Sequence, residues 1–356
     1  METSKQIAIG IVGCGALTEL YYAPSLREIE RAGLARVASI FDPSPERLAA
    51  IGALLPGAKQ FADFGEFLKS APAMAILASP AKFHAPQSIA LLEKGAFVLC
   101  EKPMAATVDE AEKMMAAAGA NQRLAVGLFR RFFPATQLIR EYMERGILGK
   151  PLRFEFTEGG AFNWPAQSAS FFEKKTAHGG VLLDLGVHLL DLALWWFGEP
   201  ASFEYEDDAM GGLEINSVLR LDYASGLKGV VQLSRDWDLP NRYVIHCEKG
   251  WIAWKVGEAN QIEIGAQGMT TALKAQVHET KRFAAGKLAP SYAESFVLQL
   301  LNCLHAMEGR ACLAVPGAEG IRSLRLIEAC YGKRQLLRMP WMTKTEMTRA
   351  AALAFA

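Results

Sequence analysis

The chain has 356 residues, with 38 Lys plus Arg and 38 Asp plus Glu, so its formal net charge at pH 7 is zero. At about 150 residues per domain, this length predicts two domains. The balanced charge gives no global attraction to nucleic acid or to an anionic membrane, and we expect neither as a partner. The six cysteines are scattered without a C-x-x-C pair, which favours reduced thiols over disulfides or a zinc site.

The first apolar run, Ile7–Val12, begins so near the N-terminus that it leaves no room for a targeting peptide, and we expect a cytoplasmic protein. The later apolar stretch Val181–Gly198 contains three ionisable side chains on one helical stripe. A membrane-spanning helix rarely tolerates such groups. This stretch therefore predicts a buried helix of a soluble protein.

The first third of the chain alternates short apolar runs with helical patterns. The predicted strands are Ile7–Val12, Arg36–Phe41, Ala73–Ala78, Phe97–Cys100 and Leu124–Phe129. The predicted helices are Leu17–Ala32, Pro45–Leu54, Pro86–Lys94 and Asp109–Ala118. This alternation is typical of βαβ units, and it predicts an α/β domain with a doubly wound parallel sheet over residues 1–131.

After a helical segment from Pro134 to Gly146, the pattern changes to short strands with turn residues between them. The candidates are Leu152–Glu158, Ser202–Glu206, Ile215–Tyr223, Leu227–Ser234, Tyr243–Cys247, Trp251–Val256 and Gln261–Ile264. Strands at such short spacing pair as hairpins, so we expect an α+β domain over residues 132–340 on an open, mostly antiparallel sheet. Helices at Tyr292–Glu308 and Ala318–Gln335 close this domain. Residues 341–356 form a tail, for which a short exposed helix is one option.

A glycine-rich turn follows the first predicted strand directly. Gly13 permits a tight turn, and Gly15 lets the backbone approach a pyrophosphate at the positive end of the next helix. Ala16 and Leu17 open that helix. The order of strand, G-x-G and helix predicts a Rossmann dinucleotide-binding domain, with these four residues at the cofactor.

Asp42 ends the second predicted strand, where a carboxylate can bind the adenosine ribose hydroxyls and repel a 2′-phosphate. This position favours NAD as the cofactor, with NADP possible. Two alternatives stay open at this point. Asp42, which precedes Pro43, can instead cap a turn, and the nearby Arg47 can neutralise a phosphate.

Asp184 and His188 are four residues apart in the apolar stretch, so in a helix they share one face. An imidazole that titrates near neutrality suits removal of a hydroxyl proton during hydride transfer. His188 is therefore the candidate base, and Asp184 can address the same substrate. Burial statistics alone favour the alternative of a satisfied core histidine. Asp191, one turn further on, is expected to be structural.

Five segments carry a family resemblance. They are G-I-V-G-C-G-A-L-T-E-L-Y-Y-A-P-S-L near the N-terminus, S-P-A-K-F-H at Ser79–His84, C-E-K-P-M-A at Cys100–Ala105, R-R-F-x-P at Arg130–Pro134 and G-G-V-L-L-D-L-G-V-H-L-L-D at Gly179–Asp191. Together they resemble the glucose-fructose oxidoreductase, inositol dehydrogenase and MocA (Gfo/Idh/MocA) oxidoreductase family, over nearly the whole chain. The resemblance implies an NAD(P)-dependent dehydrogenase that acts on a CH-OH group of a sugar or cyclic polyol.

The E-K-P segment lies at the carboxyl edge of the predicted parallel sheet. There the ammonium of Lys102 can hold the reacting oxygen and stabilise alkoxide charge beside His188, although an isolated loop lysine is by default solvated and inert. The resemblance implies that Glu101 binds the nicotinamide ribose and that Lys102 lies beside the cofactor.

Other candidates border the same cleft. Ser79, Pro80 and His84 are expected beside the cofactor, with His84 a cofactor-side or structural contact and not a second base. The candidates for the substrate pocket are Arg131, Trp164, Asp184 and Tyr292, where the Trp164 ring offers a stacking face for a sugar. His178 is either a substrate contact or a loop residue. No pattern explains the loop Gly159–His178, where we expect substrate choice to be determined.

The leading hypothesis is a dehydrogenase without a bound metal, assembled as a homodimer or homotetramer through the C-terminal sheet, whose open face needs cover. One alternative is an NAD-dependent glycosidase that oxidises its substrate transiently. Another is a non-catalytic nucleotide-binding sensor. The presence of Lys102, Asp184 and His188 argues against a sensor, because a sensor needs no path for a proton.

Overall fold

The computed structural model describes residues 6–119, 122–165, 172–269, 271–276, 292–338 and 343–354. The chain divides into two compact units. The first unit contains Met1–Phe132, Pro165–Phe171 and Lys281–Ile321. The second unit contains Phe133–Trp164, Phe172–Thr280 and Arg322–Ala356.

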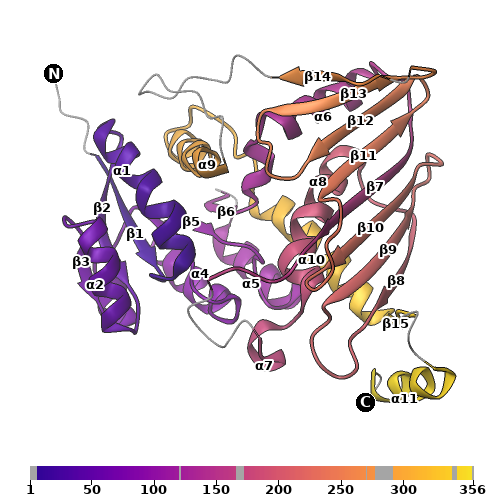
Figure 1. Ribbon diagram of the computed structural model, residues 1–356. Helices are drawn as coiled ribbons and strands as arrows, with labels where there is room; N and C mark the ends of the chain where they lie inside the picture. Colours follow the sequence, from indigo (N-terminus) through magenta and orange to yellow (C-terminus); the bar gives the residue numbers. More distant parts are fainter. Residues whose placement is uncertain are drawn as a thin grey trace. The chain divides into compact units, whose positions relative to one another are not determined.

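The first unit is built on a parallel sheet of six strands, in the order β3-β2-β1-β4-β5-β6 (Figure 1). The strands are β1 (Ile7–Val12), β2 (Ala35–Phe41), β3 (Lys59–Phe61), β4 (Met74–Leu77), β5 (Phe97–Cys100) and β6 (Leu124–Val126). This sheet confirms the predicted doubly wound fold. The edge strand β3 was not predicted, because its three residues have little apolar character and are largely exposed. The last predicted strand ends early, at Val126, where Leu128 N donates to Val126 O and the chain turns.

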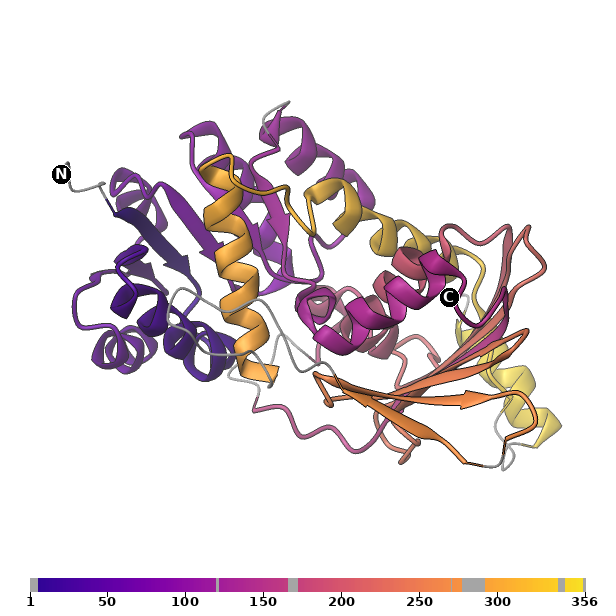
Figure 2. The same ribbon diagram turned by 90° about the horizontal axis from the view of Figure 1, so that it is seen from above.

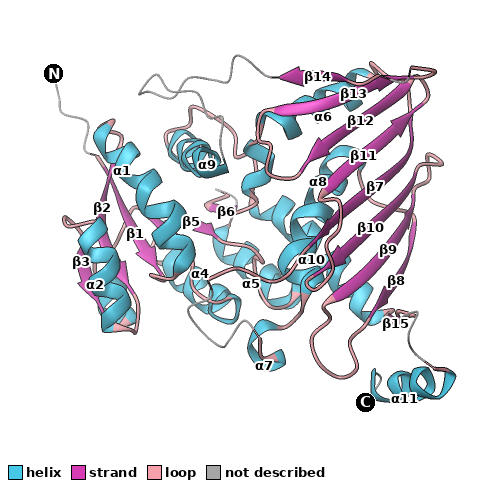
Figure 3. Cartoon of the chain, in the orientation of Figure 1, coloured by secondary structure: helices cyan, strands magenta, loops and turns pink. Residues whose placement is uncertain are grey.

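Helices flank the parallel sheet on both sides (Figure 3). They are η1 (Thr18–Tyr22), α1 (Ala23–Arg31), α2 (Pro45–Leu54), α3 (Phe64–Lys69), η2 (Ala81–Phe83), α4 (His84–Glu93) and α5 (Val108–Ala118). At the start of α5, the hydroxyl of the N-cap residue Thr107 accepts from Glu110 N, and the Glu110 carboxylate accepts from Ala106 N at 3.0 Å. The predicted helix Leu17–Ala32 consists of the π-helical turn η1 followed by α1.

The first unit also includes a segment from late in the sequence. Helix α9 (Tyr292–Met307) packs through Phe296, whose ring stacks on Tyr21 at 5.0 Å and on Phe129 in η3 (Phe129–Phe132) at 4.9 Å between centroids. Phe296 is 1% exposed. Burial of the Phe296 face attaches this helix to the first unit, which is therefore discontinuous in sequence.

The second unit contains a sheet of nine strands, in the order β14-β13-β12-β11-β7-β10-β9-β8-β15. They are β7 (Pro151–Gly159), β8 (Ser202–Asp207), β9 (Asn216–Asp222), β10 (Lys228–Ser234), β11 (Arg242–Cys247), β12 (Gly250–Lys255), β13 (Gln261–Ala266), β14 (Leu273–Gln276) and β15 (Gln335–Leu336). Among the described strands of this sheet, all pairs are antiparallel except β7 with β10 and β8 with β15. The prediction of a mostly antiparallel sheet is confirmed, and the two parallel pairs join strands far apart in sequence.

One face of this sheet carries helices α6 and α8 (Figure 2). The helices of the unit are α6 (Pro134–Arg145), α7 (Lys174–Ala177), η5 (Leu182–Gly186), α8 (Val187–Phe197), α10 (Gly317–Gly332, in this unit from Arg322 on) and α11 (Lys344–Ala354). At the centre, the buried Phe156 ring stacks on Tyr243 at 4.6 Å and meets Trp196 edge-on at 5.8 Å. Helix α10 ends at Gly332, so the predicted end at Gln335 is wrong, since Gln335 pairs with β8.

The apolar stretch with the three ionisable groups lies in the core of the second unit. By length and composition alone, the helical stretch Lys174–Phe197 could cross a membrane. Of its 18-residue apolar window, however, 72% is buried inside the structure. Its apolar side chains are therefore already covered by protein, as predicted for a core helix. The opposite sheet face exposes alternate residues of the central strands, among them Glu155 and Val230.

Candidate functional site

The glycine turn of the first unit follows β1 directly. Gly13 has φ +99°, and its N–H donates to Phe41 O at 2.8 Å. A Cβ at this position would lie 2.6 Å from the backbone carbon of Ala78, so only glycine fits. Around Gly15, by contrast, no atom lies within 4 Å of an added Cβ. The turn thus packs tightly against the protein at Gly13 and leaves free space at Gly15. A dinucleotide-binding turn requires both features.

Thr18 stands where the dinucleotide fingerprint usually has a third glycine. Its buried hydroxyl donates to Gly13 O at 2.6 Å. This bond satisfies a carbonyl of the glycine turn from the first residue of η1. The hydroxyl thus explains how the turn accommodates a threonine in place of the third glycine.

Asp42 connects the end of β2 to the glycine turn. Its carboxylate accepts from Cys14 N at 2.8 Å and from Ser44 N at 2.9 Å. The turn-capping alternative for Asp42 is therefore observed, and its binding of a ribose stays a prediction. Arg47 donates from Nε to Cys14 O at 2.8 Å and pairs with Glu19 at 2.5 Å, so its charge is partly compensated.

The loops that follow β4 and β5 lie side by side, because these two strands are paired. Ser79 and Pro80 belong to the first loop, and Glu101 and Lys102 belong to the second, in which the Lys102–Pro103 peptide bond is cis. His84, at the start of α4, bridges them. Its Nδ1 lies 2.8 Å from Pro103 O and its Nε2 lies 2.7 Å from Ser79 O.

His84 is only 1% exposed, and burial lowers its pKa, with a further contribution from the charge of Lys102. The ring is therefore enclosed between two backbone carbonyls, and both of its nitrogens face a protein partner. Direct contact of His84 with a cofactor stays a prediction.

Glu101 is a buried carboxyl group with partners from distant segments. Tyr22 donates to it at 2.5 Å, and Gln299 in turn donates to the Tyr22 hydroxyl at 3.1 Å. An added Cβ on Gly127 would lie 2.7 Å from the carboxylate, so that glycine makes room for it. Burial raises the pKa of Glu101 to about 7. Sequence reasoning missed Tyr22 and Gln299, because each has the pattern of an ordinary residue of an amphipathic helix.

In the second unit, Asp184 lies in the π-helical turn η5 and forms an ion pair with Arg235. Both side chains are about one-fifth exposed, at 20% and 23%. The Arg235 guanidinium also lies 5.4 Å from the ring centroid of Phe162, and Arg235 O accepts from Phe162 N. The unexplained loop after β7 is thus attached to the partner of Asp184. Arg235 was not predicted, since nothing in its local sequence connects it to Asp184.

The backbone amides of Gly180 and Leu182, in the same motif, hold the segment that carries Asp184 and His188. Glu214 accepts from Gly180 N at 2.9 Å and from Leu182 N at 3.2 Å, and Tyr331 donates to the same oxygen at 2.6 Å. An added Cβ on Gly180 would lie 2.0 Å from Glu214 O. A side chain at Gly180 would therefore displace the start of this helix. His188 itself is buried at 5% exposure.

The remaining candidates differ in what the structure shows of them. Arg131 is 2% exposed and pairs with Glu319 at 3.0 Å inside the first unit. Trp164 is half-buried at the edge of the described loop. Tyr292 begins α9, and its side chain lies outside the described residues. The substrate roles of these three residues stay predictions.

The predicted catalytic residues are divided between the two units. Lys102 belongs to the first unit, whereas Asp184 and His188 belong to the second. Each half of the predicted centre is thus built by contacts inside its own unit: the His84 bridge on one side, and the Glu214 and Arg235 contacts on the other.

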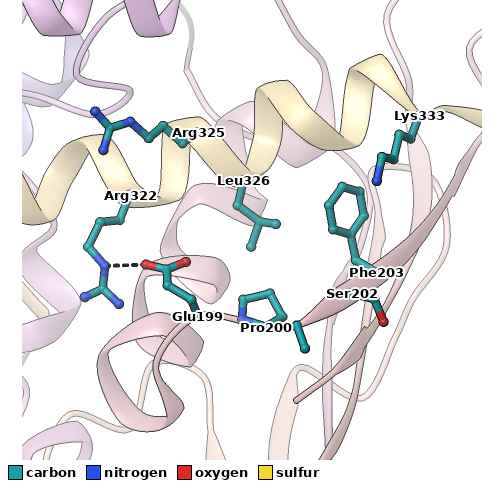
Figure 4. Close-up of a pocket in the computed structure, with 9 residues that line it drawn as sticks. Glu199, Pro200, Ser202, Phe203, Arg322, Arg325, Leu326 and Lys333 are labelled. Atoms are coloured by element: carbon teal, nitrogen blue, oxygen red, sulfur yellow. Dashed lines mark hydrogen bonds and ion pairs between the residues drawn. The ribbon is translucent and has the colours of Figure 1, made fainter. Parts of the chain in front are cut away.

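A separate surface hollow of about 510 Å³ lies in the second unit (Figure 4). It is lined by Glu199, Pro200, Ala201, Ser202, Phe203, Arg322, Arg325, Leu326 and Lys333. Arg322 donates to Glu199 at 2.7 Å, and the Lys333 ammonium lies 4.8 Å from the centroid of the Phe203 ring. None of the predicted site residues lines this hollow.

Two protein-family models match the chain in succession. The model described as an oxidoreductase family with an NAD-binding Rossmann fold matches residues 7–128. The model described as the GFO/IDH/MocA C-terminal domain matches residues 136–253.

Known proteins are similar to the chain at lower identity. The rhizopine catabolism protein MocA of Rhizobium meliloti is 28% identical over 64% of this chain and 71% of its own length. Inositol 2-dehydrogenase 4 of Saccharopolyspora erythraea is 25% identical over 83% of this chain and 82% of its own. A solved structure of levoglucosan dehydrogenase in complex with NADH and levoglucosan has a TM-score of 0.81 at 19% identity, covering 92% of this chain and 97% of that one. At this identity the structural match shows the fold alone.

The raised pKa of Glu101 predicts a pH-dependent stability. A carboxyl whose pKa is raised on folding contributes fully at low pH, and the contribution is lost as the pH rises through the folded value of about 7. Between pH 5 and pH 8, the free energy of unfolding should therefore fall by about 2–3 kcal/mol through this group. Glu101→Gln should remove that part of the decline, as measured by denaturant unfolding at several pH values. The exposed Glu93→Gln serves as the control, and a parallel decline in wild type and Glu101→Gln would contradict the prediction.

Proposed function

Because the chain belongs to the GFO/IDH/MocA family of oxidoreductases and carries its NAD-binding domain, we propose that it transfers hydride between NAD and a hydroxyl carbon of a sugar or cyclic polyol. The observation that carries this proposal is the succession of the two family domains, with Lys102 in the first and His188 in the second. Inositol and levoglucosan, which appear in the names of similar proteins, are the first substrates to test.

The residues of the glycine turn fit the cofactor. The closed side at Gly13 and the open space at Gly15 suit a pyrophosphate against the backbone, and Ala16 and Leu17 continue into the helix that follows. Asp42 lies beside Cys14 in this turn, where its carboxylate favours an unphosphorylated ribose. When bound, NAD supplies the acceptor for the hydride.

The protein supplies the path for the proton. His188 accepts the proton of the substrate hydroxyl while the carbinol carbon loses hydride and its C–O bond becomes a carbonyl, so charge and atoms balance. The ammonium of Lys102 holds the same oxygen and stabilises the negative charge that develops on it. Asp184, oriented by Arg235, binds a neighbouring hydroxyl group. A cytoplasmic location is part of the same proposal.

A screen of sugars and polyols with NAD and NADP, followed by the absorbance of the reduced nicotinamide, tests this function. We expect turnover of at least one polyol or sugar with added NAD. A protein that binds NADH but reduces no NAD with any member of the panel would contradict the proposal.

Removal of either predicted catalytic group should affect chemistry more than cofactor binding. Lys102→Ala and His188→Ala should each lower kcat on the order of 10²- to 10⁴-fold, because proton transfer and charge stabilisation act in the transition state. The dissociation constant of NAD, measured by fluorescence titration, should change little. Lys94→Ala, at an exposed lysine beyond the end of α4, is the matched control. An equal loss of cofactor affinity would remove both residues from the catalytic assignment.

Loss of the Asp42 charge should relax cofactor choice. In Asp42→Asn, an amide oxygen still accepts from Cys14 N while the repulsion of a 2′-phosphate disappears. The ratio of kcat/KM for NADP to that for NAD should rise on the order of tenfold, which corresponds to about 1.4 kcal/mol. Asp42→Ala should give the same direction with weaker binding of both cofactors. An unchanged ratio in both variants would exclude Asp42 from the ribose role.

We further propose that the chain assembles as a homodimer or homotetramer through the open face of the nine-stranded sheet. Val230 on β10 is 38% exposed, and by the strand register Val218 on β9 and Val244 on β11 lie on the same face. Light scattering should give a dimer or tetramer, and Val230→Arg should shift the mass toward the monomer. The control is Leu152→Arg at the end of β7. A monomeric wild-type protein would refute the assembly.

A further inference from the structure

We propose that His84 is a positioning residue: its imidazole ties the loop that carries Lys102 to the loop that carries Ser79, and so holds the lysine for the reaction. The inference rests on the proposed function, because it gives His84 its effect through Lys102. It assigns His84 no contact with substrate.

The geometry of the bridge is specific to the two loops. The two ring nitrogens face two different backbone carbonyls, those of Pro103 at 2.8 Å and of Ser79 at 2.7 Å. Pro103 follows Lys102 directly in the chain. Because Ser79 and Pro103 follow the paired strands β4 and β5, one side chain connects the ends of two neighbouring strands.

The backbone of His84 is held by helix α4. His84 is the first residue of α4, and its backbone N–H closes the short turn η2 by donating to Ala81 O. The same helix makes a second attachment to the Ser79 loop, since Ser79 Oγ donates to Gln87 at 2.6 Å. Loss of the His84 ring should therefore disturb the Lys102 loop more than the Ser79 loop, which keeps its bond to Gln87.

An imidazole suits this bridge better than most other side chains. Its two nitrogens point in different directions, so a single ring reaches two acceptors on separate loops. Phenylalanine has the same approximate shape and no donor, whereas glutamine keeps a neutral donor. Because both partners are carbonyl acceptors, the neutral ring donates to only one of them, and both bonds form together only when both nitrogens carry a hydrogen. Burial and the nearby charge of Lys102 lower the pKa of the ring, whereas the two carbonyl contacts raise it.

A pair of variants with one control separates positioning from stability. His84→Phe removes the polar bridge while filling the space, and His84→Gln restores one donor. Leu91→Ala, in the same helix and 1% exposed, destabilises the unit without touching either loop. For each protein we would measure kcat, the dissociation constant of NADH, the midpoint of thermal unfolding, and hydrogen exchange of the amides between residues 101 and 106.

We expect His84→Phe to lower kcat on the order of 10- to 100-fold, because a small displacement of a catalytic group has that effect. NADH affinity should change much less. Hydrogen exchange in residues 101–106 should be faster in His84→Phe than in Leu91→Ala at an equal loss of thermal stability, and His84→Gln should recover part of kcat.

Two outcomes overturn the inference. One is a His84→Phe protein with the kcat and loop exchange of wild type. The other is a Leu91→Ala protein that loses kcat and loop protection as much as His84→Phe does, since general destabilisation would then explain both. A wild-type protein without dehydrogenase activity would refute the proposed function alone, because the exchange comparison tests the bridge without turnover.

Discussion

A close backbone contact at the end of β1 determines how the loops of the first unit are arranged. The position of Gly13 against Ala78 leaves no space for a side chain, and its N–H is bonded to Phe41 O. The ends of β1, β2 and β4 therefore converge. Asp42 and Thr18 then satisfy the polar groups of the turn, through Cys14 N and Gly13 O. Any bulkier residue at Gly13 would separate these strand ends and the loops that follow them.

The second unit also contains a glycine that packs closely against the backbone of a distant segment. Gly180 lies against the backbone of Glu214, whose carboxylate accepts from two amides at the start of the helical segment. Burial raises the pKa of Glu214, so the carboxylate depends on the hydrogen bonds of those amides and of Tyr331 for compensation. In both units, the close approach at a glycine lets a carboxylate from a distant segment accept from backbone amides. These amides lie just before residues that we propose for catalysis or cofactor binding.

Features that depend on local sequence could be predicted, and features that join distant segments could not. The parallel strands and the glycine turn follow from apolar periodicity and residue spacing, and the structure contains both. The Tyr22–Glu101–Gln299 chain and the Asp184–Arg235 pair join residues far apart in sequence. Their side chains carry no signal of a partner, because a polar residue on a half-buried helix has the same pattern with or without one.

The discontinuity of the first unit has a consequence for biosynthesis. Phe296 and Gln299, which complete its aromatic core and its buried carboxyl network, leave the ribosome only after the whole nine-stranded sheet except β15 has been translated. The packing of the nascent first unit therefore stays incomplete until α9 has been translated, and the Tyr21 and Tyr22 face stays uncovered until then. A fragment that ends after η3 would leave this aromatic face exposed. A stable minimal cofactor domain would therefore need residues 292–321, joined to the fragment through a linker.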